Sequence, residues 1–287
     1  MLAFVLVVAS AFLHAAWNAL VRRSPDPATA VHVVVAIAGV IAAVVATVEL
    51  SLGYHGLPPR AIALGVAAGV LEAGYFSALG RALAIAPLPT VYTVSRGGAA
   101  ILVWPISIVA LGERATLLAA IGSACVILGL AISSELGRSA TRGPRTTPPR
   151  AIVWAAQCAC FIAGYHFAYK YALRADASPG AVFAISMVVA TGLGALIGGA
   201  GYRTRFAALV RARPGLTLGA GVVCATAFLL FMIGLAGGGA AYVFTLRNTS
   251  VLFAIALAWL IGDHPSRPQV IGAAIVFAGA VLLGLGH

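Results

Sequence analysis

Apolar segments about 20 residues long recur along almost the whole chain and alternate with short polar links. About 20 apolar residues, rising about 1.5 Å each in an α-helix, cross the hydrocarbon core of a bilayer, which is about 30 Å thick. With 62% hydrophobic and only 9% charged residues, the chain cannot cover a water-exposed surface. The pattern excludes a soluble, monomeric domain and predicts an all-α polytopic membrane protein.

Ten such segments fit the chain, and each predicts one transmembrane helix. They cover residues 2–21, 28–50, 61–82, 87–111, 115–134, 151–172, 179–201, 215–236, 239–262 and 267–286. The first lacks the basic residues that precede the apolar stretch of a signal peptide, and it carries His14, Trp17 and Asn18 in its second half. We therefore expect it to be a helix of the mature protein.

A polar stretch over residues 135–150, rich in Pro, Gly, Thr and Arg, separates five predicted helices from five. We predict a first five-helix repeat over residues 1–134, a cytoplasmic linker over 135–150 and a second five-helix repeat over 151–287. A fixed offset of 150 residues pairs Tyr92 with Tyr242, Ser95 with Thr245, Gly112-Glu113 with Gly262-Asp263, Gly122 with Gly272 and Gly129 with Gly279. Since five is odd, the repeats are expected to be inverted, an architecture typical of secondary transporters with a substrate site near the midplane.

The net charge of +11 is explained by the links between the helices. Twelve arginines fall on one predicted side of the membrane, namely Arg22, Arg23, Arg81, Arg138, Arg142, Arg145, Arg150, Arg203, Arg205, Arg211, Arg213 and Arg267. Only three, Arg60, Arg114 and Arg174, fall on the other. The positive-inside rule then places the first set in the cytoplasm and both termini outside, in a bacterial-type inner (plasma) membrane, and a nucleic-acid partner is not expected.

Of the charged residues within predicted spans, five require an explanation: Glu49, Glu72, Arg96, Lys170 and Arg247. Each costs about 2.5–3.5 kcal/mol at the bilayer centre, so each needs a reason. Glu49 and Lys170 are close to helix ends and are expected to extend to the interface. Glu72 and Arg96 are near mid-span, and two interpretations stay open: an interhelical ion pair, or residues of a transport pathway.

Helical spacing places polar and aromatic side chains on the same faces as these charges. The resulting candidate substrate site consists of His14, Trp17, Asn18, Glu72, Tyr75, Tyr92, Ser95, Arg96, His166 and Tyr242. Arg247 is left out because it is turned well away from Tyr242 on its helix. His14 and His166 occupy nearly matching positions of the two repeats, and both a packing role and a proton-carrying role stay open for them.

Other classes of function lack their sequence signals. The four cysteines form no CxxC pair, and the chain has neither an HExxH nor a GxSxG sequence and only seven acidic residues. We therefore expect that the protein is not an enzyme and has no metal site and no cofactor. Because the chain has no Walker A sequence, we do not expect ATP to drive transport. A channel is disfavoured because the halves are inverted and no ring of charges is repeated.

Segment 14–18 (HAAWN) and the turns Gly112-Glu113 and Gly262-Asp263 resemble the ten-helix EamA-type exporters of the drug/metabolite transporter superfamily. The resemblance covers nearly the whole chain and includes the kind that exports aromatic amino acids. It implies export of amino acids and related metabolites through a central basket formed by both halves. The cavity-lining residues that it implies are His14, Trp17, Asn18, Tyr92 and Arg96.

Together these observations predict a monomeric secondary exporter whose partners are a small-molecule substrate and the lipid bilayer. The leading substrate is an amino acid with an aromatic or bulky side chain, held by aromatic faces, by Arg96 at its carboxylate and by Glu72 or Asn18 at its ammonium. Either Glu72 or the histidines could carry a proton, or transport could be downhill exchange. The alternatives are a multidrug or organic-cation exporter, anchored at Glu72, and a nucleotide-sugar or metabolite exchanger.

Overall fold

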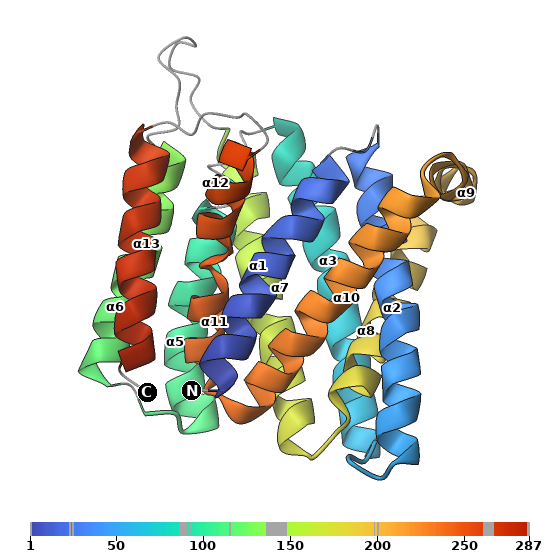
Figure 1. Cartoon of the computed structure of the whole chain (residues 1–287), viewed down its shortest axis with the longest axis horizontal. Helices are drawn as coiled ribbons and strands as arrows, with labels where there is room; N and C mark the ends of the chain where they lie inside the picture. The colour runs from blue at the N-terminus through green and yellow to red at the C-terminus, as the bar shows by residue number, and fades with distance from the viewer. Residues whose placement is uncertain are drawn as a thin grey trace.

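The structure, a computed structural model, describes residues 2–22, 24, 26–85, 91, 93–114, 116–135, 148–197, 199, 201–260 and 267–285. Within them the secondary structure is helical, and the one extended pairing is an isolated bridge between Gly56 and Ala177. The elements, drawn in Figure 1, are α1 (Leu2–Arg22), α2 (Pro27–Ser51), α3 (Pro59–Ile85), the π-helix η1 (Thr93–Gly97), α5 (Gly98–Leu111), α6 (Leu117–Glu135), α7 (Pro149–Arg174), α8 (Pro179–Ile197), α9 (Tyr202–Ala212), α10 (Pro214–Gly237), α11 (Ala240–Arg247), α12 (Ser250–Leu260) and α13 (Arg267–Leu285).

Eight stretches of these residues are long and apolar enough to cross a membrane, and two shorter apolar helices, Leu117–Ile132 and Arg267–Leu283, stand beside them. Large apolar side chains such as Val40, Val109 and Leu196 are exposed on the outer surface of the bundle, where only lipid can solvate them favourably. The expected all-α polytopic membrane fold is therefore confirmed.

The ninth predicted span is interrupted, which hydropathy does not reveal. α11 ends at Arg247, and the amides of Asn248 and Thr249 donate to the carbonyl oxygens of Thr245 and Leu246, both at 3.1 Å, before α12 begins. In the fourth predicted span the π-helix η1 precedes α5. Broken or irregular helices at membrane depth are tolerated where protein surrounds them, and they commonly mark the binding sites of transporters.

The link between α8 and α10 contains a helix that hydropathy alone does not predict. α9 is only 11 residues long and buries Tyr202 and Leu209 against the bundle, whereas Arg203, Arg205 and Arg211 are exposed. In Figure 1 it is seen end-on beside the upper end of α10, across the direction of the spanning helices. An amphipathic helix in this place and orientation fits the interface of the membrane.

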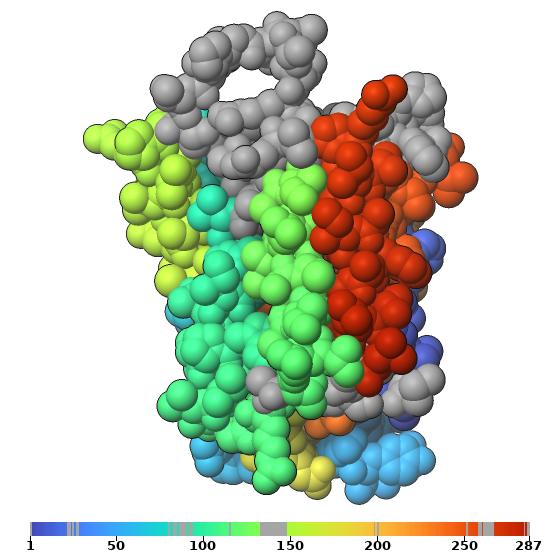
Figure 2. All heavy atoms as spheres, turned by 90° about the vertical axis from the view of Figure 1, so that its left-hand side faces the viewer, coloured from blue at the N-terminus to red at the C-terminus, as the bar shows by residue number. Residues whose placement is uncertain are grey.

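The helices of the two halves pack against each other symmetrically: the main contacts between a helix of the first half and one of the second are repeated by the equivalent helices. α1 packs on α10 as α3 packs on α7, while α2 packs on α8 and α6 on α13. A Cβ at Gly122 would lie 2.8 Å from the carbonyl oxygen of Gly279, and one at Gly129 would lie 2.6 Å from that of Gly272. These glycines are the ones matched at an offset of 150 residues. Figure 2 shows α6 and α13 side by side. The exact boundaries of the two repeats and the linker stay a prediction.

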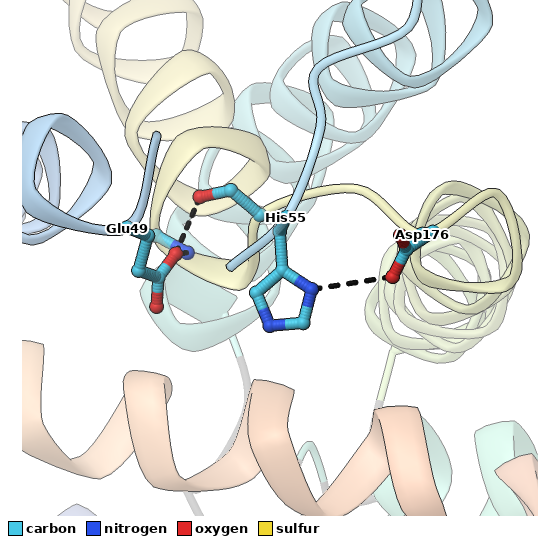
Figure 3. Close-up of polar contacts among 5 residues, drawn as sticks. Glu49, His55 and Asp176 are labelled. Carbon is cyan, nitrogen blue, oxygen red and sulfur yellow. Dashed lines mark hydrogen bonds and ion pairs between the residues drawn. The ribbon is translucent and has the colours of Figure 1, made fainter. Parts of the chain in front are cut away.

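Both chain ends lie at the same end of the bundle (Figure 1), and loops from the two halves are joined there. Gly56 N donates to Asp176 O at 3.1 Å, and Ser178 N donates to Gly56 O at 2.9 Å. His55 Nδ1 lies 3.2 Å from Asp176 Oδ1, as Figure 3 shows. The two halves are therefore in contact through backbone and side chains at this end.

Lys170 is buried and does not extend to the interface, so that expectation is wrong for Lys170, whereas for the partly buried Glu49 it stays a prediction. Glu49 accepts hydrogen bonds from Ser178 Oγ and, at 3.1 Å, from Gly180 N (Figure 3), which caps the N-terminus of α8. Lys170 is buried, and its Nζ donates to Leu235 O at 2.7 Å and Gly238 O at 2.6 Å, at the C-terminus of α10. Both charges stabilise helix ends of the second half.

Candidate functional site

Arg96 lies in η1 and contacts both α1 and the turn between α11 and α12. Its Nη2 is 3.0 Å from His14 Nε2, and its Nη1 donates to Asn248 Oδ1 at 3.4 Å. Because a guanidinium group only donates hydrogen bonds, His14 Nε2 is the acceptor in the first contact. Arg96 thus joins the first half to the broken helix of the second half.

His14 stands between two groups that can only donate hydrogen bonds. Besides Arg96 at its Nε2, the indole Nε1 of Trp17 lies 3.3 Å from its Nδ1, and the two rings meet edge-on at 5.3 Å between centroids. A neutral imidazole has one acceptor nitrogen, so it cannot accept from both. An acceptor group placed between Arg96 and His14 would satisfy both side chains.

Arg247 and Asn248 are buried next to this contact, with exposed fractions of 4% and 0%. The guanidinium carbon of Arg247 lies 4.4 Å from the ring centroid of Phe228 and 4.0 Å from that of Phe231, which is cation–π geometry. In the described part of the chain, Arg247 Nη2 and Asn248 Nδ2 have no hydrogen-bond partner. Two buried donors are therefore left without an acceptor.

His166, on α7, is a buried hydrogen-bond acceptor without a donor in the described chain, the reverse of Arg247 and Asn248. Its Nδ1 lies 2.7 Å from the carbonyl oxygen of Ile162, which requires Nδ1 to carry the proton and leaves Nε2 as an acceptor. This Nε2 is buried and has no partner among the described residues. The ring packs edge-on against Phe231 and Phe244 at 5.2 and 4.7 Å, so His166 and Arg247 touch the same Phe231 ring.

Glu72 forms no ion pair with an arginine among the described residues and is almost fully buried, with 3% exposure. Ser186 Oγ donates to Glu72 Oε2 at 3.0 Å, and the Tyr169 hydroxyl bonds to the same Ser186 Oγ. Across the described residues the only ion pair is that of His55 with Asp176. The interpretation of Glu72 and Arg96 as an ion pair is therefore wrong.

The other predicted site residues are distributed around these groups. Asn18 Nδ2 donates to the carbonyl oxygen of His14 at 2.7 Å, within its own helix. Ser95 is buried in η1 and Tyr242 in α11, whereas Tyr75 is partly buried in α3, with its ring 6.4 Å from that of Tyr165. Tyr92 lies outside the described residues.

Sequence reasoning missed Arg247 and Asn248 as members of the site. The helical-wheel argument assumes that one face of a helix is interior, but every residue of α11 is buried. A better signal would have been that Arg247 is a charge next to an Asn-Thr-Ser run inside an apolar segment. Polar residues inside a span usually face protein rather than lipid.

The arrangement can bind an anion that also carries an apolar group and a hydrogen-bond donor. Buried polar groups without partners cost about 1–3 kcal/mol each, so three of them close together are not expected from packing alone. A carboxylate can accept from Arg247, Asn248 and Arg96, and the rings of Phe228, Phe231 and Phe244 can contact apolar atoms. The described residues contain no group of three or more His, Cys, Asp or Glu that could hold a metal ion.

A match to a protein family and the likeness to a solved structure support this fold. Residues 149–285 match the family described as the EamA-like transporter family. A solved structure described as "Crystal structure of protein" is 20% identical, with a TM-score of 0.74, over 99% of this chain and 96% of that chain. At this identity the likeness shows the fold alone, and no curated protein matches the chain.

The family match covers α7 to α13, the half that carries His166, Arg247 and Asn248. The structural likeness covers nearly the whole chain and therefore includes both halves. The chain therefore carries an EamA-like transporter family domain over residues 149–285 and fits the EamA type of the drug/metabolite transporter superfamily.

Proposed function

We propose that the chain is a secondary transporter that exports amino acids with aromatic or bulky side chains, by alternating access to a central site between its halves. The observation that carries the proposal is the pair of buried donors without partners, Arg247 Nη2 and Asn248 Nδ2. An amino acid supplies the carboxylate that they lack. It also supplies an ammonium group and a side chain for the surrounding rings.

In this scheme the substrate carboxylate accepts from Arg247 and Asn248 and draws Arg96 away from His14. The substrate ammonium donates to His166 Nε2, the acceptor without a partner. This assignment differs from the expected use of Asn18 or Glu72 for the ammonium, because Asn18 bonds within its own helix and Glu72 bonds to Ser186. The aromatic or bulky side chain packs against Phe228 and Phe231.

Two arginines at one site disfavour an organic cation and leave a phosphorylated metabolite or nucleotide sugar as the second candidate. Phosphate groups, like carboxylates, are bound by guanidinium groups in bidentate geometry. The two candidates differ in the ammonium group, which only the amino acid offers to His166. Competition between an amino acid and its deaminated carboxylic acid would show whether that group contributes.

The proposal is tested with purified protein in proteoliposomes. Internal L-phenylalanine or L-leucine should stimulate uptake of the labelled amino acid, and the exchange should saturate. Tetraphenylphosphonium and a nucleotide sugar, loaded in parallel vesicles, should give no stimulation. Counterflow with either of these probes and none with amino acids would overturn the proposal.

We also propose that both termini lie outside the cytoplasm of a bacterial-type inner membrane and that the monomer is the functional unit. The arginine distribution supports the orientation. A reporter fused after His287 that is active only outside the cytoplasm is the expected outcome. Activity only in the cytoplasm would reverse the assignment.

A further inference from the structure

Glu72 is a buried carboxylate that the proposed substrate site does not use. It lies within the apolar stretch Pro59–Leu79 of α3, and only 3% of the residue is exposed. A charge at this depth costs several kcal/mol unless it is paired or neutralised. Its surroundings show how both its ionised and its protonated form can be accommodated.

Close packing of α3 on α8 places Glu72 against the second half. A Cβ at Gly69 would lie 2.6 Å from both the carbonyl oxygen of Ser186 and Cβ of Val189, and one at Gly65 would lie 3.1 Å from Ile185 Cγ2. Glu72 follows Gly69 by three residues and therefore lies on the same face of α3. The small residues allow the helices to approach until the carboxylate reaches Ser186.

The ionised form of Glu72 receives hydrogen bonds from hydroxyl groups of the second half. Ser186 Oγ donates to Oε2 at 3.0 Å, and the Tyr169 hydroxyl bonds to Ser186 Oγ. Because the single Ser186 proton is then directed at Glu72, Tyr169 is the donor to Ser186. These bonds connect α3 of the first half to α7 and α8 of the second.

The protonated form can be satisfied by the same atoms. Ser186 Oγ has a second acceptor within reach, the carbonyl oxygen of Phe183 at 3.2 Å. If its proton turns to Phe183, the Ser186 oxygen can accept from a protonated Glu72 and from Tyr169 together, since a hydroxyl oxygen has two lone pairs. Rotation of one hydroxyl thus accommodates either state of the carboxyl group.

No base or cation forms an ion pair with Glu72 in the part of the chain that the structure describes. The titratable and charged groups that interact electrostatically with Glu72 are Tyr169 and Tyr165 on α7, Cys224 on α10 and Arg247 on α11. From α8 it faces the neutral Ser186. A proton is therefore the simplest way to neutralise this carboxylate.

We propose that Glu72 is a proton-binding site that couples the halves of the transporter to the proton gradient, an inference that rests on the proposed function. The ionised carboxylate requires the donors of α7 and α8 and holds α3 against them. When a proton binds a carboxylate oxygen, the charge is lost and α3 can leave these donors without exposing an ion to the membrane interior. The halves then move with the proton, and substrate leaves in exchange for it.

The proton site is tested without any substrate by infrared difference spectroscopy of the purified protein between about pH 4 and about pH 9. The wild type should show the carbonyl band of a protonated, buried carboxyl group, and Glu72→Gln should lose it. Glu113→Gln should retain the band, since that carboxylate caps α11 at a loop. Ser186→Ala should shift the band, because a hydrogen bond to the carboxyl group is removed. A band unchanged in Glu72→Gln would overturn the proposal.

Transport assays distinguish proton coupling at Glu72 from binding at the substrate site. In proteoliposomes with L-phenylalanine as the probe, Glu72→Gln should retain counterflow without a pH gradient but lose accumulation driven by one. Accumulation equal to that of the wild type would refute coupling and leave the proposed function intact. Absence of counterflow in the wild type would refute the proposed function, while the infrared band still decides whether Glu72 binds a proton.

Discussion

Two buried polar clusters lie between the halves, and they differ in how their hydrogen bonds are satisfied. The Glu72 cluster, formed by Glu72, Ser186 and Tyr169, is linked by a continuous chain of bonds. The arginine cluster, formed by His14, Arg96, His166, Arg247 and Asn248, contains three buried atoms without partners in the described chain. A cluster whose hydrogen bonds are all made can hold two helices together, whereas one with unpaired buried donors and acceptors is suited to binding a ligand.

Because of this difference, the Glu72 cluster is suited to binding a proton and the arginine cluster to binding the amino acid. A proton can be added to the Glu72 cluster without further space, because a hydroxyl rotation accommodates it. An amino acid cannot enter the arginine cluster in this conformation, because the orphaned atoms are sealed from solvent. The clusters therefore predict different phenotypes: loss of substrate affinity for one, and loss of the response to the pH gradient for the other.

The largest effect is expected for Arg247→Met, which keeps apolar volume between Phe228 and Phe231 but removes the donor. A hydrogen bond to a charged group contributes about 1.5–3 kcal/mol, so substrate affinity should fall about 10- to 100-fold. The measurement is the half-saturating concentration in counterflow. Arg267→Met, at an exposed arginine of α13, is the control and should leave affinity unchanged. An unchanged affinity in Arg247→Met would remove the arginine cluster from the substrate site.

A comparable loss, but of stability, is expected for Gly69→Ala. The added Cβ would meet backbone and side chain of α8 at 2.6 Å, and overpacking of this kind costs about 1–3 kcal/mol. The thermal unfolding temperature should fall, and the response to a pH gradient should weaken because α3 is displaced from Ser186. Gly219→Ala, where nothing lies within 4 Å of the added atom, is the matched control. Equal stability of the two variants would contradict the close packing of α3 on α8.

Arg96→Ala should have a smaller effect than Arg247→Met, because Arg96 is only partly buried and already has partners in His14 and Asn248. An affinity loss of about 3- to 10-fold is expected. Combining it with Asn248→Ala in a double-mutant cycle measures whether the two side chains act together. Strict additivity of the two losses, or export and binding like those of the wild type, would remove Arg96 from the scheme.

The fold was largely predictable because the bilayer sets the length of every spanning helix. The 150-residue offset matches Gly122 with Gly272 and Gly129 with Gly279. In the fold the contacts are crossed, Gly122 with Gly279 and Gly129 with Gly272, so the offset identified the four glycines but not their partners. The position of α9 was not predictable from hydropathy, since its arginines lower the average of a helix that buries only Tyr202 and Leu209. The break at Asn248 was hidden for the opposite reason, because apolar residues surround it.

The candidate site was only partly predictable. His14 and Arg96 were identified from charge and helical phase, and the structure brings them into contact. Ser186 was not identified, because one serine in an apolar helix has no local pattern and its bond to Glu72 spans 114 residues of sequence. Contacts of this kind depend on how helices from different halves pack, which single-helix periodicity does not contain.

The smallest effects are expected for Glu113→Gln and Glu49→Gln, and this pair distinguishes the two clusters most directly. Glu113 accepts from Ala240 N at 2.5 Å and Ala241 N at 3.3 Å, at the N-terminus of α11, the helix that ends in Arg247. Glu49 accepts from Gly180 N at 3.1 Å, at the N-terminus of α8, the helix that carries Ser186.

Each substitution removes a negative charge from a helix N-terminus, a change of about 0.3–1 kcal/mol. Because each helix positions a different cluster, Glu113→Gln should lower substrate affinity by about two- to fivefold with the pH response intact. Glu49→Gln should weaken the pH response with substrate affinity intact. Both are measured by counterflow and by accumulation driven by a pH gradient. Identical phenotypes would mean that the clusters act as one unit, and the division of cargo between Glu72 and Arg247 would then be wrong.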